Sequence, residues 1–487
     1  MAEILCINPS TPEGILASEG SAPYLGIAYI GAFLEKHGYS VGIIDAPIEN
    51  IDLKKLIEKH DPSVTCISGT TPRRFDSFKI AKISKELLPE TITVYGGPHA
   101  TFTAEDTLQN VPWIDIIVRG EGELTILELV KALLSKNPDL KNILGISYRK
   151  NNKVCNNPPR PQIKNLDELP FPAYHLFDID QYNMKLYLDL HRKSDDNNNI
   201  HRALNIITSR GCTNRCTFCA ACAMWKRVTT RSPKNVIDEI EELVNTYGID
   251  GINFVDSTLT LHKDHILGIC NEIKERHLDI AWFCEARVNT INKNILEKMK
   301  NAGCTYIQVG VESGSPRILK KIKKNITIEQ VKQVAHWSKE VGLRIRASFM
   351  FGLPEETYED AITTVQLIHE LKKMDIDYGA NATIIYPGTE VESFAREKGY
   401  LPPNFSWSEP YSDKVYKNQK VPLLIQPQMG YLELKRLIGY EIKKDEIFSL
   451  NGLFKKMKSI QSAEDLKEYW KSVMKISKIL LGRRAQG

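Results

Sequence analysis

The sequence predicts an α/β protein in which a doubly wound parallel sheet precedes a partial (β/α) barrel. Three observations support this prediction. Short apolar runs alternate with amphipathic segments over the first 140 residues, a proline-rich stretch from Pro158 to Pro172 interrupts the alternation, and the alternation resumes with longer helices after Leu204. A chain of 487 residues is long enough for two or three domains.

The first region is predicted to form a Rossmann-like, flavodoxin-like sheet. Apolar runs predict strands at 4–7, 41–45, 64–68, 92–95 and 114–118. Amphipathic periodicity predicts helices at 25–37, 53–60, 75–88 and from Glu121 onward. Ligands of such sheets lie beyond the carboxyl ends of the strands. Glycine- or serine-rich turns follow those ends at 68–72, 96–101 and 119–123, so we expect a ligand there.

A hairpin is predicted next, at 143–154, with Asn151 and Asn152 at its turn. The second region predicts strands at 204–209, 251–255, 281–285, 306–311, 345–351 and 381–385. Six such units make a partial (β/α)6 barrel, with functional loops at the strand carboxyl ends. A third, mostly helical region is expected after Pro402, where Trp407 either caps the barrel or belongs to a structural cluster. The expected divisions are 1–140, 141–200 (hairpin and linker), 201–400 and 401–487.

The bulk composition is that of an ordinary globular protein. Hydrophobic residues make up 42% and charged residues 25%, and the net charge of +4 gives no reason to expect a nucleic-acid partner. No basic stretch followed by an apolar run begins the chain, and no run approaches the roughly 20 apolar residues of a spanning helix. We expect a cytoplasmic protein. Basic side chains near Gly487 leave a peripheral contact with a membrane open, although a solvated helix is the commoner explanation.

Four of the ten cysteines are crowded into one segment, 212–222. Cys212, Cys216 and Cys219 follow an apolar strand, and three thiolates would leave one iron of a [4Fe–4S] cluster open where four would saturate it. A structural zinc site with Cys222 as the fourth ligand is the alternative, but zinc prefers two cysteine pairs and no second pair follows. We favour the cluster and interpret Cys222 as non-ligating.

This segment resembles the radical S-adenosylmethionine (SAM) superfamily in its Cys-x3-Cys-x2-Cys spacing and in Phe218, the aromatic residue before the third cysteine. Further motifs follow in the family's order at 231–233, 254–256, 282–287, 303–304, 310–315, 351–357 and 386–389. The resemblance covers roughly residues 204–390. It implies that the open iron binds SAM and that an electron from the cluster cleaves SAM to a 5′-deoxyadenosyl radical. It also implies an external one-electron donor of the flavodoxin or ferredoxin type.

The resemblance implies SAM contacts at six positions: Asp256, Arg287, Gly310, Glu312, Gly352 and Leu353. Asp256 would accept a hydrogen bond from the methionine ammonium, with a helix N-cap as an equal alternative. Arg287 would pair with the carboxylate, and a structural salt bridge is its rival. Glu312 would bind the ribose hydroxyls or the ammonium, and the turn at Gly352 would pack near adenine, unless it is an ordinary strand-to-helix turn.

The first region resembles the cobalamin-binding radical SAM enzymes in its turns at 68–72, 96–101 and 119–125 and in residues 23–29. The resemblance implies bound cobalamin with contacts at Ser68, Thr70, Gly96, Gly97, His99, Gly120 and Glu121. Glycines would let the corrin approach the backbone closely. One departure is clear: the loop at 8–14 lacks the His of the Asp-x-His-x-x-Gly motif, so that route gives cobalt no lower ligand. We expect His99 to line the pocket rather than to bind cobalt.

Together the resemblances imply an enzyme that methylates an unactivated carbon of a small-molecule or lipid substrate. The radical would remove hydrogen, methylcobalamin would deliver the methyl group, and a second SAM would regenerate it. The alternatives are a cobalamin-dependent radical cyclase, oxidase or ring-contracting enzyme without methyl transfer, and a non-catalytic cobalamin or redox sensor. A methylthiotransferase acting on tRNA would need three further cluster cysteines in the first region, where only Cys6, Cys66 and the distant Cys155 occur.

Overall fold

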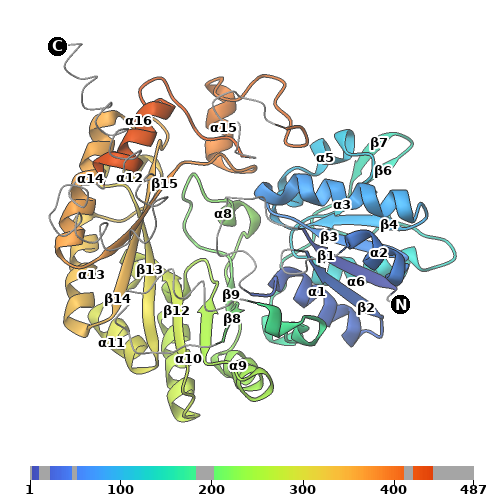
Figure 1. Cartoon of the computed structure of the whole chain (residues 1–487), viewed down its shortest axis with the longest axis horizontal. Coiled ribbons are helices and arrows are strands. Elements are labelled where there is room, and N and C mark those ends of the chain that lie inside the picture. Colours follow the sequence, from blue (N-terminus) through green and yellow to red (C-terminus); the bar gives the residue numbers. More distant parts are fainter. Residues whose placement is uncertain (1–2, 10–21, 47–51, 183–201, 411–420, 443–487) are drawn as a thin grey trace, which may run out of the picture. The chain divides into compact units, whose positions relative to one another are not determined.

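The computed structural model of the chain describes residues 3–9, 22–46, 52–182, 202–410 and 421–442 (Figure 1). The chain divides into a compact unit, Met1–Gly430, and a second unit, Tyr431–Gly487. The described part of the second unit is helix α16 (Tyr431–Arg436) followed by a π-helical turn (Leu437–Glu441). The sites discussed below all belong to the first unit.

The first sheet is the predicted doubly wound sheet, with strand order β2-β1-β3-β4-β5-β6-β7. Its parallel strands are β1 (Ile4–Asn8), β2 (Val41–Asp45), β3 (Val64–Ser68), β4 (Ile92–Gly96) and β5 (Ile116–Val118). The order 2-1-3-4-5 is that of flavodoxin-like sheets, whose ligand site lies where the order reverses, between β1 and β3.

The predicted hairpin adds two strands to the edge of this sheet. The sequence predicted the hairpin but not its place in the sheet. Strands β6 (Ile146–Lys150) and β7 (Lys153–Asn156) add to β5 in antiparallel fashion. Asn151 and Asn152 form the turn between them with φ angles of 49° and 58°, the left-handed values that a two-residue hairpin turn requires. The turn chemistry was therefore readable from the sequence, whereas the pairing partner of the hairpin was not.

Helices cover both faces of the first sheet. They are α1 (Leu25–Lys36), α2 (Leu53–His60), α3 (Arg74–Leu87), α4 (Pro98–Phe102), α5 (Ala104–Asn110) and α6 (Glu123–Leu133). Helix α1 contacts α6, and α2 contacts α3. The strands supply fully buried apolar side chains such as Ile7, Ile67 and Tyr95, which is the near-continuous burial expected of a parallel sheet covered on both faces.

The second sheet is the predicted six-stranded partial barrel, with its parallel strands in the order β15-β14-β13-β12-β11-β8. The strands are β8 (Ala203–Ile206), β11 (Gly251–Phe254), β12 (Ala281–Ala286), β13 (Cys304–Glu312), β14 (Arg344–Phe351) and β15 (Asp377–Ala382). Strand β15 begins four residues before the predicted start at 381. It is an edge strand of partly buried residues, so it lacks the apolar run on which the prediction relied.

The barrel helices carry clear start and stop signals. They are α9 (Pro233–Tyr247), α10 (Lys263–Glu275), α11 (Lys293–Asn301), α12 (Pro316–Lys321), α13 (Ile328–Val341), α14 (Tyr358–Lys373) and α15 (Glu390–Glu397). Helix α9 starts at the N-cap Ser232 with Pro233 in its first turn and ends at the left-handed Gly248. Helix α13 begins with a capping box of Thr327 and Gln330.

Of the region expected to be helical, 401–487, the structure describes residues 401–410 and 421–442, and the rest lies outside the described residues. Described residues between 401 and 430 form turns and isolated bridges, and helix begins only at Tyr431. Trp407 is buried in a small apolar cluster with Ile385, Leu401 and Leu424, the structural alternative that the sequence left open. None of the helices among the described residues is long and apolar enough to cross a membrane.

Candidate functional site

The cysteine loop leaves the barrel at the carboxyl end of β8. Residues Ser209–Arg210 form a short strand, β9, that pairs in antiparallel fashion with β10 (Thr229–Thr230). Gly211 then turns the chain with φ of +96°, and a Cβ there would lie 2.6 Å from the carbonyl oxygen of Arg227. Only glycine fits this turn, which fixes the direction in which the chain enters Cys212.

Asp256 braces the start of this loop. Its carboxylate, 1% exposed, accepts hydrogen bonds from Thr208 Oγ1 (2.9 Å), from the Thr208 backbone N–H (3.2 Å) and from Ser209 Oγ (2.5 Å). His265 Nε2 lies 2.8 Å from Thr208 Oγ1, and burial lowers the pKa of His265 to about 4, so this imidazole is neutral. Asp256 makes no N-cap hydrogen bond to the helical turn that follows it, so the capping alternative is wrong.

The four cysteines lie close enough to influence one another. The pKa of the Cys219 thiol is raised to about 11, mainly by burial and also by the neighbouring Cys222, Cys216 and Cys212. Cys222 donates its S–H to the carbonyl oxygen of Cys219 at 3.0 Å. Arg287, 4% exposed, directs Nη1 at Cys216 Sγ at 3.4 Å. Among the described residues, no three His, Cys, Asp or Glu side chains form a site for a single metal ion.

The end of β13 presents a buried ion pair. Glu312, at a φ of +72°, pairs with Lys324 at 2.7 Å, and both side chains are at most 10% exposed. A Cβ on Gly310 would lie 2.3 Å from Glu312 Oε1 and 2.7 Å from Lys324 Nζ, so a side chain there would displace the pair. Lys324 Nζ also lies 6.0 Å from the centre of the Phe218 ring. The strained backbone and the buried charge mark this strand end as a functional position.

The Gly352–Leu353 turn is held in place by the buried carboxyl group of Glu356. Glu356 Oε2 accepts hydrogen bonds from the N–H groups of Gly352 (2.6 Å) and Leu353 (3.1 Å). Burial raises the pKa of Glu356 to about 8, so this group is protonated at neutral pH. Gln426 Nε2 donates to the Leu353 carbonyl at 2.8 Å. Leu353 itself is fully buried and packs in a cluster with Phe218, next to the third cysteine.

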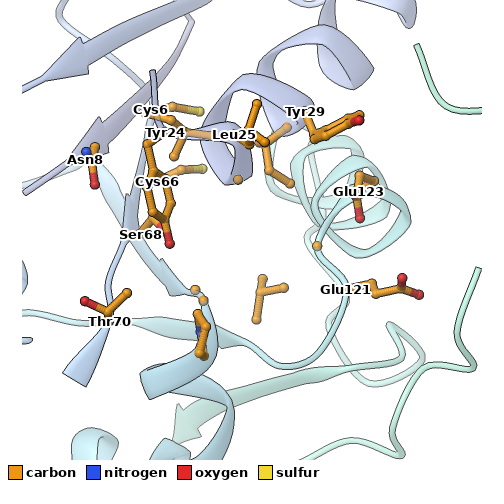
Figure 2. A pocket seen from close by; sticks show the side chains of 18 of the residues that line it. Cys6, Asn8, Tyr24, Leu25, Tyr29, Cys66, Ser68, Thr70, Glu121 and Glu123 are labelled. Atoms are coloured by element: carbon orange, nitrogen blue, oxygen red, sulfur yellow. The ribbon is translucent and has the colours of Figure 1, made fainter. Parts of the chain in front are cut away.

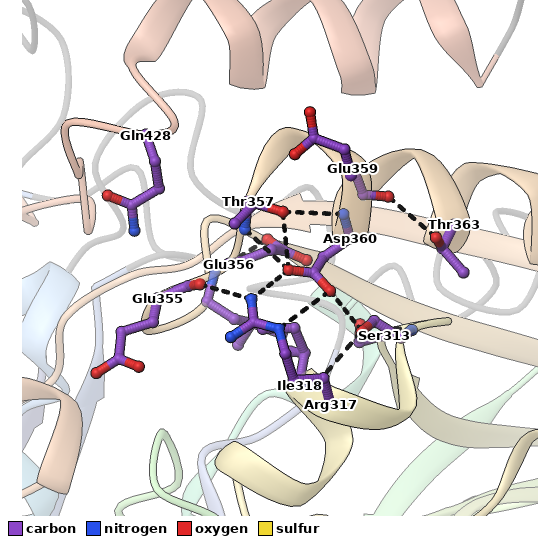
Figure 3. Close-up of polar contacts among 12 residues, drawn as sticks. Ser313, Arg317, Ile318, Glu355, Glu356, Thr357, Glu359, Asp360, Thr363 and Gln428 are labelled. Atoms are coloured by element: carbon purple, nitrogen blue, oxygen red, sulfur yellow. Dashed lines mark hydrogen bonds and ion pairs between the residues drawn. The ribbon is translucent and has the colours of Figure 1, made fainter.

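Figure 3 shows how the loops after β13 and β14 are tied together. Asp360 accepts hydrogen bonds from Ser315 Oγ (2.6 Å) and Thr357 Oγ1 (3.0 Å) and pairs with Arg317. Burial alone would raise the pKa of Asp360, but these donors outweigh it and lower that pKa. A Cβ on Gly314 would lie 2.7 Å from Thr364 Cα. The two loops are therefore joined by hydrogen bonds, an ion pair and close packing at one edge of the barrel.

A cavity of about 480 Å³ lies at the carboxyl edge of the first sheet (Figure 2). Figure 2 places Asn8, Ser68 and Thr70, from the ends of β1 and β3, opposite Glu121 and Glu123. The cavity thus occupies the point where the strand order reverses, as the fold predicts. Its volume falls in the range of small-molecule pockets, about 300–1,000 Å³.

Six of the seven positions predicted to contact cobalamin line this cavity: Ser68, Thr70, Gly96, Gly97, Gly120 and Glu121. The prediction for His99 is wrong. Its side chain is fully buried outside the lining, with Nδ1 3.2 Å from Thr71 Oγ1 and its ring against Trp407. The sequence placed His99 in a glycine-rich turn, but helix α4 begins at Pro98 and turns the imidazole inward.

The cavity suits a ligand, or the part of a larger ligand, that brings its own polar groups. The hydroxyl oxygen of Thr70 is buried there without a hydrogen-bond partner among the described residues. Gly97, at φ +99°, has no room for a side chain, because a Cβ would lie 2.9 Å from the Gly69 carbonyl oxygen. A buried hydroxyl without a partner costs stability unless a ligand satisfies it. Cobalamin, with amide groups around an apolar macrocycle, meets this description.

Several lining residues were not predicted. Asn8 and Asp45 are the last residues of β1 and β2, and a 2.6 Å hydrogen bond joins their side chains. Their places at strand ends could have identified them from the sequence. Arg210 and Trp225 come from the barrel region and complete the wall. No local pattern in the sequence marks these two residues, because their neighbours in the cavity are distant in the chain.

Comparisons with known proteins agree with both parts of the structure. The model of the B12 binding domain matches residues 14–130, and that of the radical SAM superfamily matches residues 206–368. An uncharacterized methyltransferase from Pyrococcus horikoshii is 41% identical over 81% of this chain and 83% of its own length. An anaerobic magnesium-protoporphyrin IX monomethyl ester cyclase from Rubrivivax gelatinosus is 30% identical over 75% of this chain and 65% of its own length.

Solved structures share the fold. The radical SAM methyltransferase TsrM from Kitasatospora setae, with cobalamin and a [4Fe–4S] cluster bound, aligns with a TM-score of 0.65 and 20% identity over 82% of this chain and 75% of its own. The cobalamin-dependent SAM radical enzyme OxsB aligns with a TM-score of 0.69 and 17% identity, over 99% of this chain and 72% of its own. The resemblance predicted from the motifs is thereby confirmed: the chain belongs to the radical SAM superfamily, among the members that carry an N-terminal B12-binding domain.

Proposed function

We propose that this protein is a cobalamin-dependent radical SAM methyltransferase that methylates a carbon atom of a small-molecule substrate. One observation carries the proposal. The cavity at the ends of β1, β3 and β4 is also lined by Arg210, which stands two residues before Cys212. A ligand in this cavity therefore faces the loop of the proposed cluster. Methyl transfer to a substrate radical needs such proximity, because reacting groups must approach within a few ångströms.

The cysteines have separable roles in this proposal. Cys212, Cys216 and Cys219 would hold the [4Fe–4S] cluster and leave one iron for SAM. Cys222 would brace the loop, because its thiol already donates to the Cys219 carbonyl. Arg287 would stabilise the sulfur of Cys216 through its 3.4 Å contact. When bound, the cluster and SAM supply the radical that removes hydrogen from carbon, and cobalamin supplies the methyl group.

The barrel edge would hold SAM through groups whose charges are already balanced. Glu312 would accept hydrogen bonds from SAM while Lys324 compensates its charge. The turn at Gly352 would offer backbone groups to the adenine, since Glu356 and Gln426 fix its orientation from the opposite side. Asp256 would act indirectly, by holding Thr208 and Ser209 ahead of the cysteines.

The first sheet would hold cobalamin by close backbone approach and a few polar groups. Gly96, Gly97 and Gly120 would let the corrin lie against the strand ends, and Ser68 and Thr70 would hydrogen-bond its polar side groups. The His-free loop at 8–14 falls largely outside the described residues. Because this loop contains no histidine, we propose that it supplies no imidazole ligand to cobalt. We also propose that an external flavodoxin- or ferredoxin-type protein delivers the electron.

The relatives favour methyl transfer over ring formation. The Pyrococcus relative is named as a methyltransferase and is more similar to this chain than the Rubrivivax relative, which is named as a cyclase. A cobalamin-dependent cyclase or oxidase remains the second candidate because of that second name. The two candidates differ in the fate of the SAM methyl group, which only a methyltransferase moves to the corrinoid and then to the substrate.

The test follows that methyl group. Reduced protein loaded with iron, sulfide and hydroxocobalamin is mixed with SAM that carries deuterium in its S-methyl group. A methyltransferase yields S-adenosylhomocysteine, labels the corrinoid fraction, and with a metabolite extract gives products heavier by one labelled methyl group. Formation of 5′-deoxyadenosine without S-adenosylhomocysteine or label transfer would favour the cyclase or oxidase. Absence of SAM cleavage, with all cofactors bound, would favour a sensor.

A further inference from the structure

Arg210 links the cysteine loop to the wall of the cavity. Its guanidinium donates to Glu121 at 2.9 Å and to Glu123 at 2.5 Å, and its side chain is 9% exposed. It also lies 5.5 Å from the centre of the Tyr29 ring. All four residues line the cavity. A buried arginine that uses both ends of its fork for carboxylates holds those carboxylates in one geometry.

Glu123 is half satisfied. Its Oε1 accepts from Arg210, whereas Oε2 is buried without a hydrogen-bond partner in the described part of the chain. Burial alone would raise the pKa of Glu123, but the charge and the hydrogen bond of Arg210 outweigh burial and lower that pKa. The side chain is therefore ionised. A buried carboxylate oxygen without a donor is costly, so a donor on a ligand in the cavity would be bound favourably.

Glu121 fixes the same loop to a third segment. One oxygen accepts from Arg210, and the other accepts from the backbone N–H of Ile163 at 2.6 Å. Ile163 belongs to the proline-rich connector between the two sheets. The turn at 119–123 is therefore joined through Arg210 to Gly211 and Cys212, which follow Arg210 directly in the chain.

We propose that Glu123 and Arg210 form a relay that couples occupation of the cavity to the position of the cysteine loop. An amide N–H on the corrin periphery donates to Glu123 Oε2, and Arg210 carries the resulting order into β9 and Cys212. The relay assigns Arg210, Glu121 and Glu123 to positioning, and it changes the role predicted for Glu121 from a direct cofactor contact to an anchor. This inference rests on the proposed function, because it takes the corrinoid as the donor.

The ion pairs require a careful choice of variants. Removing Arg210 alone leaves two buried carboxylates without their cation, which is strongly destabilising, whereas neutral replacement of all partners is tolerated far better. Arg210→Gln is therefore paired with a triple variant, Arg210→Met with Glu121→Gln and Glu123→Gln. Arg276→Gln is the matched control, because Arg276 pairs with Asp238 and Glu272 on the outer helices of the barrel and touches neither loop.

The experiment measures amide hydrogen exchange of the full-length, cluster-loaded protein with and without hydroxocobalamin. In the wild type and in Arg276→Gln, cobalamin is expected to slow exchange about tenfold both at 119–123 and at 209–212, the size of an ordinary coupling between sites. In Arg210→Gln, cobalamin should still slow exchange at 119–123 but should no longer slow it at 209–212. If that variant does not fold, the triple variant takes its place, and the slowing at 209–212 should be absent there as well.

The outcomes separate the relay from the function beneath it. Slowing at 209–212 of the same size in Arg210→Gln as in the wild type would overturn the relay. So would a wild type in which cobalamin slows exchange only at 119–123. If cobalamin slows exchange at neither segment of the wild type, the cavity is not a corrinoid site, and the proposed function fails together with the relay.

Discussion

The cavity of the first sheet and the cysteine edge of the barrel hold their proposed cofactors in different ways. At the ends of β3 and β4 the cavity is shaped by backbone: glycines, one of them without room for a Cβ, and the Thr70 hydroxyl, which has no hydrogen-bond partner among the described residues. Its wall toward the barrel instead carries the buried ion pairs of Arg210 with Glu121 and Glu123. The barrel edge is shaped by buried charge: Asp256 with its donors, and Glu312 with Lys324. A large, mostly apolar ligand needs room, whereas a small, charged sulfonium compound needs balanced charges in fixed places.

The two designs should fail differently when mutated. A backbone-lined cavity tolerates loss of one polar side chain but not an added methyl group, because the wall cannot retreat. A charge-lined edge suffers most from removal of one member of a pair, because the other charge stays buried alone. The following predictions test this contrast.

The largest effect is expected at the barrel edge, from the cysteines. Cys212→Ala, Cys216→Ala and Cys219→Ala should each abolish reductive SAM cleavage and reduce bound iron, because each would remove one of three ligands. Iron analysis and 5′-deoxyadenosine formation measure the two effects. Cys222→Ala is the control and should leave both nearly intact, since its thiol contacts backbone carbonyls. Loss of the cluster in that variant would overturn the assignment of ligands.

The next effect concerns the buried ion pair. Lys324→Met should lower the free energy of unfolding by about 3–5 kcal/mol, because Glu312 then stays buried without its cation. Chemical denaturation before cluster loading measures the loss. Lys321→Met, in an exposed pair with Glu355, should cost at most about 1 kcal/mol. Equal losses in the two variants would show that the buried pair has no special role.

A comparable test of the cavity uses one methyl group. Gly97→Ala should weaken cobalamin binding at least about tenfold, because the new Cβ would push the Gly69 backbone into the wall of the site. Equilibrium titration with hydroxocobalamin measures this. Gly248→Ala serves as the control for a positive φ: Gly248 also has a positive φ, of 64°, but no atom lies within 4 Å of its Cβ position. Unchanged binding in Gly97→Ala would place the corrinoid elsewhere.

Removing the unpaired hydroxyl should have a smaller effect. Thr70→Val should weaken cobalamin binding by roughly 2- to 12-fold, the value of one net hydrogen bond of about 0.5–1.5 kcal/mol. Stability without ligand should not fall, because Thr70 Oγ1 has no partner to lose among the described residues. If instead the variant lost stability but kept full affinity, the hydroxyl would be structural.

The last prediction concerns a pH dependence at the Gly352 turn. Glu356 has a pKa near 8 in the folded protein, above its usual value of 4.5, so the folded state binds this proton more tightly. Its contribution to stability is therefore complete below pH 4.5 and falls as pH rises toward 8. Glu356→Gln should remove this decline, and its Tm relative to the wild type should rise between pH 5 and pH 8. Parallel pH profiles of Tm would show that Glu356 does not titrate in this range.

The sequence predicted the scaffold well because the scaffold follows local rules. Strands β2 and β3 and helix α2 have the predicted bounds, and the turn of Asn151 and Asn152 was identified from its residue types. The residues at strand ends that line the cavity were identified from the sequence for the same reason. A parallel sheet brings successive strand ends to one edge, so spacing along the chain translates directly into a site.

The residues that the sequence did not predict correctly are those held by contacts between distant segments of the chain. Arg210 meets Glu123 across 87 residues, and Asp256 meets Thr208 across 48, so no window of sequence could reveal either pair. His99 was expected to line the pocket, but its ring packs against Trp407, far along the chain. Edge positions were also misjudged, as at β15, because burial there is partial. Side-chain roles at an active edge are set by tertiary partners, which a local pattern does not encode.

Cofactor stoichiometry after anaerobic reconstitution tests the central claim most directly. The full-length protein is loaded with iron, sulfide and hydroxocobalamin, desalted, and analysed for iron and cobalt. The account predicts about four irons and one cobalt per chain, with less bound cobalt but undiminished iron in Gly97→Ala. Four irons without cobalt in the wild type would contradict it, because the cavity would then serve another ligand and methyl transfer through cobalamin would be ruled out.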